Sequence, residues 1–355
     1  MRRLGGGFAA VLALAIAAIA AFGPTAASAT PSLPSGFQAL PAYENLEQPV
    51  NFRFTPAGGL FVAQKNGEIK YFAPGASTPS TFADLRKPVY DNSDRGLLGL
   101  ALDPKFEEGR PYVYALYTFN HVLGQPFDAA HYPRYGSFHE FEGDECPTPS
   151  TGCVVSGRLV RLTASGDHAA PSAAAPSEEV LLEGWCQQFL SHSIGDLAFG
   201  PEGALYVSGG DGGSYETADW GQLGGNPCGD PPDEGGSLRS QSVLRADGPA
   251  LLNGALLRIN PDTGEGWPGN PFESSADANA RRIVAFGFRN PFRFILDPVS
   301  GDAYVDNVGN SEIEEIDRFR YGAGTAYNSG WPCEEGSHPE WAFQAAIWSP
   351  TRERC

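Results

Sequence analysis

Positive charge is scarce in this chain of 355 residues, which has 24 Lys and Arg against 42 Asp and Glu and a net charge of −18. Nucleic acids and anionic membrane surfaces are bound through clustered cationic side chains, so this balance argues against both as partners. The few cations are mostly arginine. That preference fits either a polycarboxylate or sugar ligand or the base composition of the gene.

Cysteine and long apolar runs are scarce as well. The 6 cysteines include no Cys-x-x-Cys pair, so a cysteine-ligated metal or redox centre is not indicated. After Phe22 no apolar run approaches the roughly 20 residues of a membrane-spanning helix. We therefore predict no membrane span in the mature chain.

The amino terminus has the three parts of an export signal. Two arginines precede an apolar run from Phe8 to Phe22, and residues 27–29 supply small side chains for cleavage. A membrane anchor is the alternative, but the run is short for one. We predict a signal peptide at 1–29, one domain at 30–355, and a secreted or periplasmic location.

In an exported chain the cysteines indicate disulfides. Cys146 and Cys153 bracket a loop rich in Pro, Thr and Ser, and we predict that they close it. Cys186 and Cys228 flank the central stretch described next, so we predict a Cys186–Cys228 bond. Cys333 is then left with Cys355.

The central stretch runs from His192 to Gly213 and reads HSIGDLAFGPEGALYVSGGDGG. Two apolar runs flank a Gly-Pro-Glu-Gly turn, which predicts a β-hairpin followed by a glycine-rich acidic loop. Weaker copies lie at 52–62, 98–117 and 293–305. Their turn prolines are 48, 97 and 97 positions apart, close to one and two periods of a single repeat.

A second phrase, a short β run opened by glycine, follows in three of the units, at Gly67, Gly157 and Gly254. It fits an outer strand of the same sheet. Radial repetition of such sheets protects their edges, so we predict an all-β fold of the propeller type. The half-period positions near Pro149 and Gly248 carry no copy and look like loops.

Two long stretches lack periodicity and predict insertion loops, at 120–156 and 214–248. The first carries His121, His131 and His139. Three histidines raise the possibility of a metal site, but their irregular spacing favours an exposed loop.

Oxygen-bearing side chains gather in a short loop near the carboxyl end. Asp306, Asn310 and Glu312 could ligate calcium, and a solvated turn explains the same residues equally well. Trp331, in the Asn-x-Gly-Trp-Pro turn that begins at Asn328, could stack on a sugar or pack in the core.

Six motifs, in chain order, resemble the soluble pyrroloquinoline-quinone (PQQ)-dependent glucose, sorbosone and aldose sugar dehydrogenases. They are RGLLGLALDPKF (95–106), the 192–213 stretch, GALLRINPDTG (254–264), GFRNPFRF (287–294), VGNSEIEEID (308–317) and NSGWP (328–332). The resemblance implies a six-bladed β-propeller of four-stranded antiparallel blades. Family chains continue beyond the last motif, so we expect an incomplete last part.

The resemblance also implies an activity and its residues. An aldose would be oxidised at its anomeric carbon to a lactone by PQQ with calcium, and an external acceptor would take the electrons. His192 would be the base, because imidazole titrates near neutrality. The other expected residues fall into two groups. Those for the cofactor are Arg95, Asp211, Gly212, Arg289 and Asn290, and those for the substrate are Asp94, Asn328 and Trp331.

This chain departs from the family pattern at three of these motifs. Ser214 replaces an arginine that contacts the quinone, Ser329 replaces a tyrosine of the sugar pocket, and Asp94 replaces a glutamine. Two other functions therefore stay open. One is a non-catalytic propeller of the same lineage that serves as a binding module, and the other is a calcium-dependent propeller hydrolase such as a lactonase.

Overall fold

A computed structural model divides the chain into two units, Met1–Ala42 and Tyr43–Cys355. The first unit, described from residue 32, has one turn, in which Phe37 N donates to Pro34 O at 3.2 Å. The predicted signal peptide lies outside the described residues. None of the helices in the described part is long and apolar enough to cross a membrane. The described residues are 32–121, 123, 125, 126, 128, 134, 135, 146, 152–164, 177–245, 248–320 and 324–346.

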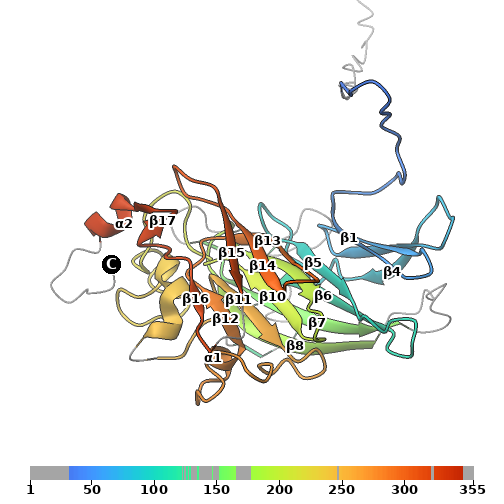
Figure 1. Cartoon of the computed structure of the whole chain (residues 1–355). Helices are drawn as coiled ribbons and strands as arrows, with labels where there is room; N and C mark the ends of the chain where they lie inside the picture. Colours follow the sequence, from blue (N-terminus) through green and yellow to red (C-terminus); the bar gives the residue numbers. More distant parts are fainter. Residues whose placement is uncertain are drawn as a thin grey trace, which may run out of the picture. The chain divides into compact units, whose positions relative to one another are not determined.

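The second unit contains four blade-like sheets in which consecutive strands pair antiparallel (Figure 1). Sheets one and two have four strands each: β1 (Pro49–Phe54), β2 (Leu60–Gln64), β3 (Glu68–Phe72) and β4 (Ser80–Asp84), then β5 (Leu97–Leu102), β6 (Tyr112–Phe119), β7 (Val155–Thr163) and β8 (Ser177–Gln187). Sheet three has β9 (Ile194–Phe199), β10 (Leu205–Gly209), β11 (Ala255–Ile259), β12 (Ile283–Phe286) and a parallel β16 (Tyr327–Asn328), and sheet four has β13 (Pro291–Leu296), β14 (Asp302–Asn307) and β15 (Glu315–Arg320).

Short elements complete the described part. They are the hairpin β17 (Glu334–Glu335) and β18 (His338–Pro339), the helices α1 (Ala278–Arg282) and α2 (Trp341–Ala346), and the 3₁₀ helix Gly236–Leu244.

The predicted hairpins are present in all four sheets. The central stretch forms β9 and β10, joined by a turn in which Gly203 N donates to Gly200 O at 2.9 Å. The weaker copies form β1–β2, β5–β6 and β13–β14, and the glycine-opened phrases form β3, β7 and β11. The alternation of apolar and polar residues therefore identified the first two strands of each sheet and three of the third strands.

Apolar layers between neighbouring sheets form the core. Phe61 and Tyr117 pack between sheets one and two, Leu197 and Leu257 belong to the layer between sheets two and three, and Phe288 lies between sheets three and four. The first strands β1, β5, β9 and β13 contact one another in that order, so we call them the inner strands.

Polar side chains tie the inner strands together. Asp196 on β9 accepts from Asn51 Nδ2 at 2.7 Å, and Arg293 on β13 donates to Val50 O on β1 at 3.1 Å. The strands approach closely at Gly195, where a Cβ would lie 2.6 Å from Pro291 O. Only glycine fits at such a contact.

The expected six blades are wrong for the described residues, which form four. The doubled proline spacings come from long insertions within blades and not from further blades. The first insertion separates β6 from β7, and the second separates β10 from β11. Both stretches were expected to be loops, and the second contains the 3₁₀ helix.

Both predicted disulfides next to the central stretch are formed. Cys146–Cys153 and Cys186–Cys228 have Cα separations of 5.1 and 5.9 Å. The proposed partner of Cys333, Cys355, lies outside the described residues, as do His131 and His139. His121 stacks on Phe119 with ring centroids 5.3 Å apart.

Removal of the Phe61 ring should destabilise the layer between sheets one and two. Phe61 is fully buried and lies 5.0 Å from the Phe82 ring and 5.6 Å from the Phe106 ring. We expect Phe61→Ala to lower the free energy of unfolding by about 3–5 kcal/mol in guanidinium denaturation. Phe54→Ala is the matched control, because Phe54 is 56% exposed. Equal losses in both variants would contradict this packing.

Candidate active site

A buried histidine–aspartate pair lies where the central stretch begins and ends. His192 Nδ1 lies 2.9 Å from Asp211 Oδ1, and the two residues are 3% and 0% exposed. Trp331 Nε1 donates to Asp211 Oδ2 at 2.8 Å, and Gly213 N donates to Oδ1 at 2.8 Å. The carboxylate can only accept, so the Nδ1 proton belongs to His192 and Nε2 is left as the acceptor.

The glycine-rich loop makes this pair possible. Gly212 N donates to His192 O at 3.0 Å, and Gly210 N donates to Ser193 O at 2.6 Å. A Cβ at Gly210 would lie 2.4 Å from His192 O, so only glycine permits the approach. His192 itself has φ 48, in the left-handed region, so these contacts hold it in a backbone conformation that is costly for a non-glycine residue.

The electrostatics of the pair favour an ionised aspartate. Burial alone would raise the pKa of Asp211, but the charge and hydrogen bond of His192, the charge of Arg289 and the Gly213 N–H hold that pKa below its ordinary value. Burial lowers the pKa of Arg289, opposed by the Asp211 charge.

A cavity of about 360 Å³ lies where the four inner strands meet, and we call it the inner-strand cavity. One apolar residue from each inner strand lines it, together with Val308, Ser93 and four further polar residues. The apolar residues are Val50, Leu98, Ile194 and Phe292, and the polar residues are Lys65, Asp94, Ser193 and Asn290. Ser193, the residue that follows His192 in the chain, lines the cavity, so the cavity lies beside the histidine.

Asp94 and Asn290, assigned from the sequence to substrate and cofactor, are brought together in this cavity. Asn290 is 8% exposed, and its Oδ1 has no hydrogen-bond partner among the described residues. A buried amide without a partner is unfavourable unless a ligand satisfies it. Lys65 was not identified from the sequence, because it belongs to no motif there.

Other predicted site residues are bonded within the protein. Arg95 is fully buried and donates to the carbonyls of Cys153, Gln187 and Phe189 at 2.6–2.7 Å. Burial lowers the pKa of its guanidinium to about 10. The Arg289 Nη1 donates to Gly309 O at 2.7 Å, although its Nε has no partner among the described residues.

Three further residues from the substrate and cofactor groups have partners within the protein. Asn328 exchanges two amide hydrogen bonds with Gln241, at 2.9 and 3.0 Å. Gly212 has φ +67, and its carbonyl accepts from Arg239 at 3.4 Å. Trp331 is 3% exposed and packs against Phe343. The indole therefore supports Asp211 from within the core, a bond that no motif in the sequence indicates.

The predicted calcium ligands do not converge in the described structure. Asp306 is exposed on β14, Asn310 Nδ2 donates to Glu340 at 3.3 Å, and Glu312 lies 3.7 Å from His338. Within the described residues no group of three or more His, Cys, Asp or Glu could hold a metal ion. The three side chains thus have separate surroundings in the described structure, and their role as calcium ligands stays a prediction.

The loop instead surrounds a carboxylate. The backbone N–H groups of residues 310–313 all donate to Glu335 Oε1, at 2.5–3.2 Å. Successive N–H groups that point inward form an anion-binding nest, which is the opposite of a cation site. The sequence could not show this, because Glu335 is more than twenty positions away.

Comparisons with known proteins agree with the fold. The sequence model of a protein family described as Glucose / Sorbosone dehydrogenase matches residues 46–344. The HIPL1 protein of Arabidopsis thaliana is 26% identical over 311 residues, which cover 81% of this chain and 40% of that protein. The chain thus spans about two fifths of the length of this curated relative.

Solved structures of sugar dehydrogenases have a similar fold. A putative glucose dehydrogenase from Thermus thermophilus has a TM-score of 0.57 and 28% identity, covering 84% of this chain and 69% of its own. The PQQ-bound aldose sugar dehydrogenase of Streptomyces coelicolor has a TM-score of 0.55 and 22% identity, covering 84% and 66%. The second similarity concerns the fold alone.

The nest around Glu335 predicts a pH-dependent contribution to stability. Burial alone would raise the pKa of Glu335. The hydrogen bonds from the four backbone N–H groups outweigh that effect and hold the pKa below the ordinary value of 4.5. The contribution should therefore be complete above pH 4.5 and lost as the pH falls through the lower folded value. We expect Glu335→Gln to lower the free energy of unfolding by about 1–3 kcal/mol at pH 7, and by less at acid pH.

Denaturation curves at several pH values would measure this difference. Glu334→Gln is the control, since Glu334 is the exposed neighbour. A loss for Glu335→Gln that does not change with pH would show that the charge of Glu335 is not what the nest binds.

Proposed function

We propose that this chain, which belongs to the glucose/sorbosone dehydrogenase family, is an exported PQQ-dependent dehydrogenase that oxidises an aldose at its anomeric carbon to a lactone. The observation that carries the proposal is the His192–Asp211 hydrogen bond of 2.9 Å beside the inner-strand cavity. The two disulfides agree with export. An external acceptor would take the electrons.

The dyad suits the proton half of this reaction. Oxidation of the anomeric carbon removes the hydroxyl proton and a hydride from that carbon. With Nδ1–H donated to Asp211, the His192 Nε2 lone pair can accept the hydroxyl proton. The ionised carboxylate of Asp211 then stabilises the imidazolium that forms, because it is already in place and buried.

The polar groups of the cavity fit part of a PQQ site. The amide of Asn290 and the ammonium of Lys65 line the cavity and could hold its carboxylates and ring oxygens. Arg289 precedes Asn290 in the chain, and its Nε has no partner among the described residues. When bound, PQQ would supply the two-electron acceptor. The described residues do not form the predicted calcium site, so we derive no role for calcium.

A binding module without catalysis is the second candidate, and the charge of the cavity favours it. Lys65 and Asp94 are the charged residues that line the cavity in the described part of the chain. Their charges balance, whereas PQQ carries three carboxylates. A calcium-dependent hydrolase would need several acids or amides that converge on one ion, and the described residues form no group of three or more His, Cys, Asp or Glu that could hold a metal ion.

Quinone titration decides between the first two candidates. Purified metal-free protein would be titrated with PQQ, with and without calcium, and then assayed for dye reduction with a panel of aldoses. We expect saturable binding and sugar-dependent turnover, and His192→Ala should lower turnover by at least about 100-fold, since general bases contribute 10²–10⁴-fold.

The matched control is His338→Ala, because His338 is 60% exposed and lies on β18. It should keep full turnover. Folded protein that binds no PQQ would exclude the dehydrogenase and leave the binding module. PQQ binding with equal turnover in both histidine variants would exclude His192 as the base.

Asp211 should act as a positioning residue for His192. Its two oxygens accept three donors, from His192, Gly213 and Trp331, whereas an asparagine has one oxygen and an NH₂ group that must face a donor. We expect Asp211→Asn to lower kcat by about 100-fold or more and to change the pH–rate profile.

Trp331→Phe, added to Asp211→Asn, removes one of the facing N–H donors and should recover part of kcat. No recovery, together with an unchanged pH profile in Asp211→Asn, would mean that Asp211 has a structural role only.

A further inference from the structure

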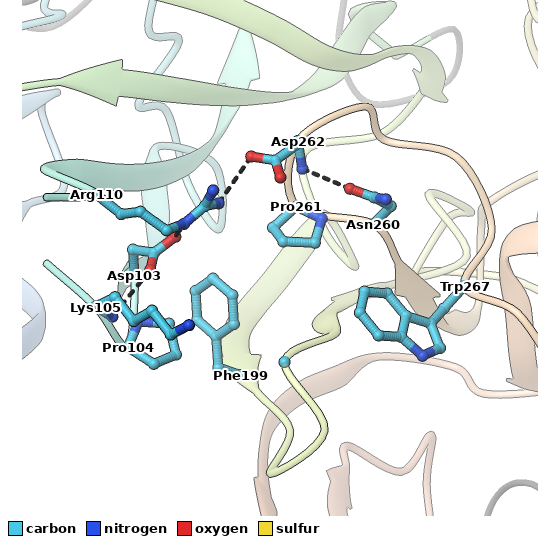
Figure 2. A pocket seen from close by; sticks show the side chains of 10 residues that line it. Asp103, Pro104, Lys105, Arg110, Phe199, Asn260, Pro261, Asp262 and Trp267 are labelled. Atoms are coloured by element: carbon cyan, nitrogen blue, oxygen red, sulfur yellow. Dashed lines mark hydrogen bonds and ion pairs between the residues drawn. The ribbon is translucent and has the colours of Figure 1, made fainter. Parts of the chain in front are cut away.

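A second cavity, of about 300 Å³, lies among the turns that follow β5, β9 and β11, and we call it the turn cavity (Figure 2). Phe199, at the carboxyl end of β9, lines it, whereas His192 precedes the other end of that strand. At about 3.3 Å per residue, β9 separates the two places by roughly 17 Å. The turn cavity is therefore distinct from the candidate active site.

One wall of the turn cavity is a fixed ion-pair chain. Arg110 Nε donates to Asp103 Oδ2 at 2.8 Å, and Arg110 Nη2 donates to Asp262 Oδ1 at 2.7 Å (Figure 2). The Asp103 side chain is only 3% exposed, and its Oδ1 accepts from Lys105 N at 2.9 Å. From outside the cavity, Arg161 Nη1 donates to Asp262 Oδ1 at 2.7 Å. These bonds hold the polar groups in place before any ligand arrives.

Two aromatic side chains supply the apolar walls. Figure 2 shows Phe199 beside the ion-pair chain and Trp267 on the far side of the cavity, with Pro261 between Asp262 and the rings. Phe199 is held in place by Tyr114, whose ring centroid lies 5.3 Å away in an edge arrangement. Both Phe199 and Trp267 are only partly buried, so part of each ring can still contact a ligand.

Several polar atoms of the lining have no partner among the described residues. Both hydrogen bonds to Asp262 use Oδ1, so Oδ2 remains able to accept. The Lys105 ammonium and the Trp267 indole N–H likewise donate to no described residue. The cavity thus offers two donors and one acceptor between aromatic walls.

We propose that the turn cavity binds one pyranose ring of a neutral saccharide. Two acids and two bases line it, Asp103 and Asp262 against Lys105 and Arg110, so the charges of the lining balance and a neutral ligand leaves that balance unchanged. A neutral sugar can accept from the ammonium and the indole, donate to Asp262 Oδ2 and lay its C–H face on Phe199 or Trp267. The volume is at the lower end of ligand pockets, which suits one ring.

This site would hold sugar without reacting with it. It lies beyond the opposite end of β9 from His192, and Asp103, Arg110 and Asp262 are bonded to each other. The proposal does not depend on the dehydrogenase activity, because it concerns other residues. It would apply equally to a catalytic or a non-catalytic member of the family.

Methyl glycosides test the proposal, since their blocked anomeric position prevents oxidation there. Cofactor-free protein would be mixed with methyl glucoside, galactoside and mannoside, and binding followed by saturation-transfer NMR. We expect saturable binding of at least one glycoside, weakened at least about tenfold in Trp267→Ala and partly retained in Trp267→Phe. Phe199→Ala should weaken binding similarly.

Three controls make the outcome decisive. Trp341→Ala removes a tryptophan that is 70% exposed outside the cavity and should bind as the unaltered protein does. His192→Ala should also bind normally, which separates the turn cavity from the candidate active site. Because the ligand is neutral, 0.5 M salt should leave the affinity unchanged within about twofold.

The proposal is overturned if folded protein binds none of the glycosides. It is also overturned if binding survives in Trp267→Ala but is lost in His192→Ala, because the sugar would then occupy the inner-strand cavity. A preference for a glucuronide over the neutral glycosides that disappears in high salt would exclude the neutral class and leave an anion site.

Discussion

The carboxylate of Asp211 is the interaction on which the candidate active site depends. A fully buried charge is unfavourable unless hydrogen bonds replace its water, and here three donors from three segments do so. His192 precedes β9, Gly213 follows β10, and Trp331 follows β16. Because all three donate to one carboxylate, the loops that carry His192 and Gly213 and the turn that carries Trp331 are held in place relative to one another. The histidine is therefore placed by the fold of the whole third sheet.

Buried charges elsewhere in the chain follow the same rule with arginine. Arg95 joins three carbonyls near the two disulfides, Arg239 joins Asp230 of the second insertion to Gln188, and the partly buried Arg293 joins β13 to β1. A guanidinium can donate five hydrogen bonds in fixed directions, which lysine cannot do. The preference for arginine over lysine therefore has a structural explanation at these positions. Neither a sugar nor a polycarboxylate is needed to explain these three arginines.

The sequence was informative where structure is local. The hairpins of all four sheets follow from apolar runs around a Pro-containing turn, and the glycines of the central loop follow from its approach to His192. The six blades were expected from the family resemblance, and the described residues form four. The repeat spacing could not decide the number, because a doubled spacing has two causes, a missing copy or a long insertion. Only the strand pairing in the structure shows that β6 and β7 are neighbours, although the first insertion separates them in the sequence.

Long-range contacts explain the remaining misses. The loop at 308–314 has the composition of a calcium site, but its N–H groups converge on Glu335, whose sequence context carries no signal. Trp331 likewise looks like a sugar platform, and its partner Asp211 is more than a hundred positions away. Composition identifies which atoms are present in a loop. It cannot identify whether the loop presents its oxygens or its N–H groups to the centre.

The strand β9 gives the two cavities opposite electrostatic character. Toward its amino end, the Asn290 Oδ1 has no partner among the described residues, so a ligand there would be recognised by a group that is still unsatisfied. Toward its carboxyl end, Asp103, Arg110 and Asp262 are already bonded to each other, so a ligand there gains little from charge. A site that must take up charge during a reaction needs the first kind of environment, and a site that only holds a neutral sugar needs the second. The distribution of partners, more than the residue types, therefore indicates which end of the strand is suited to catalysis.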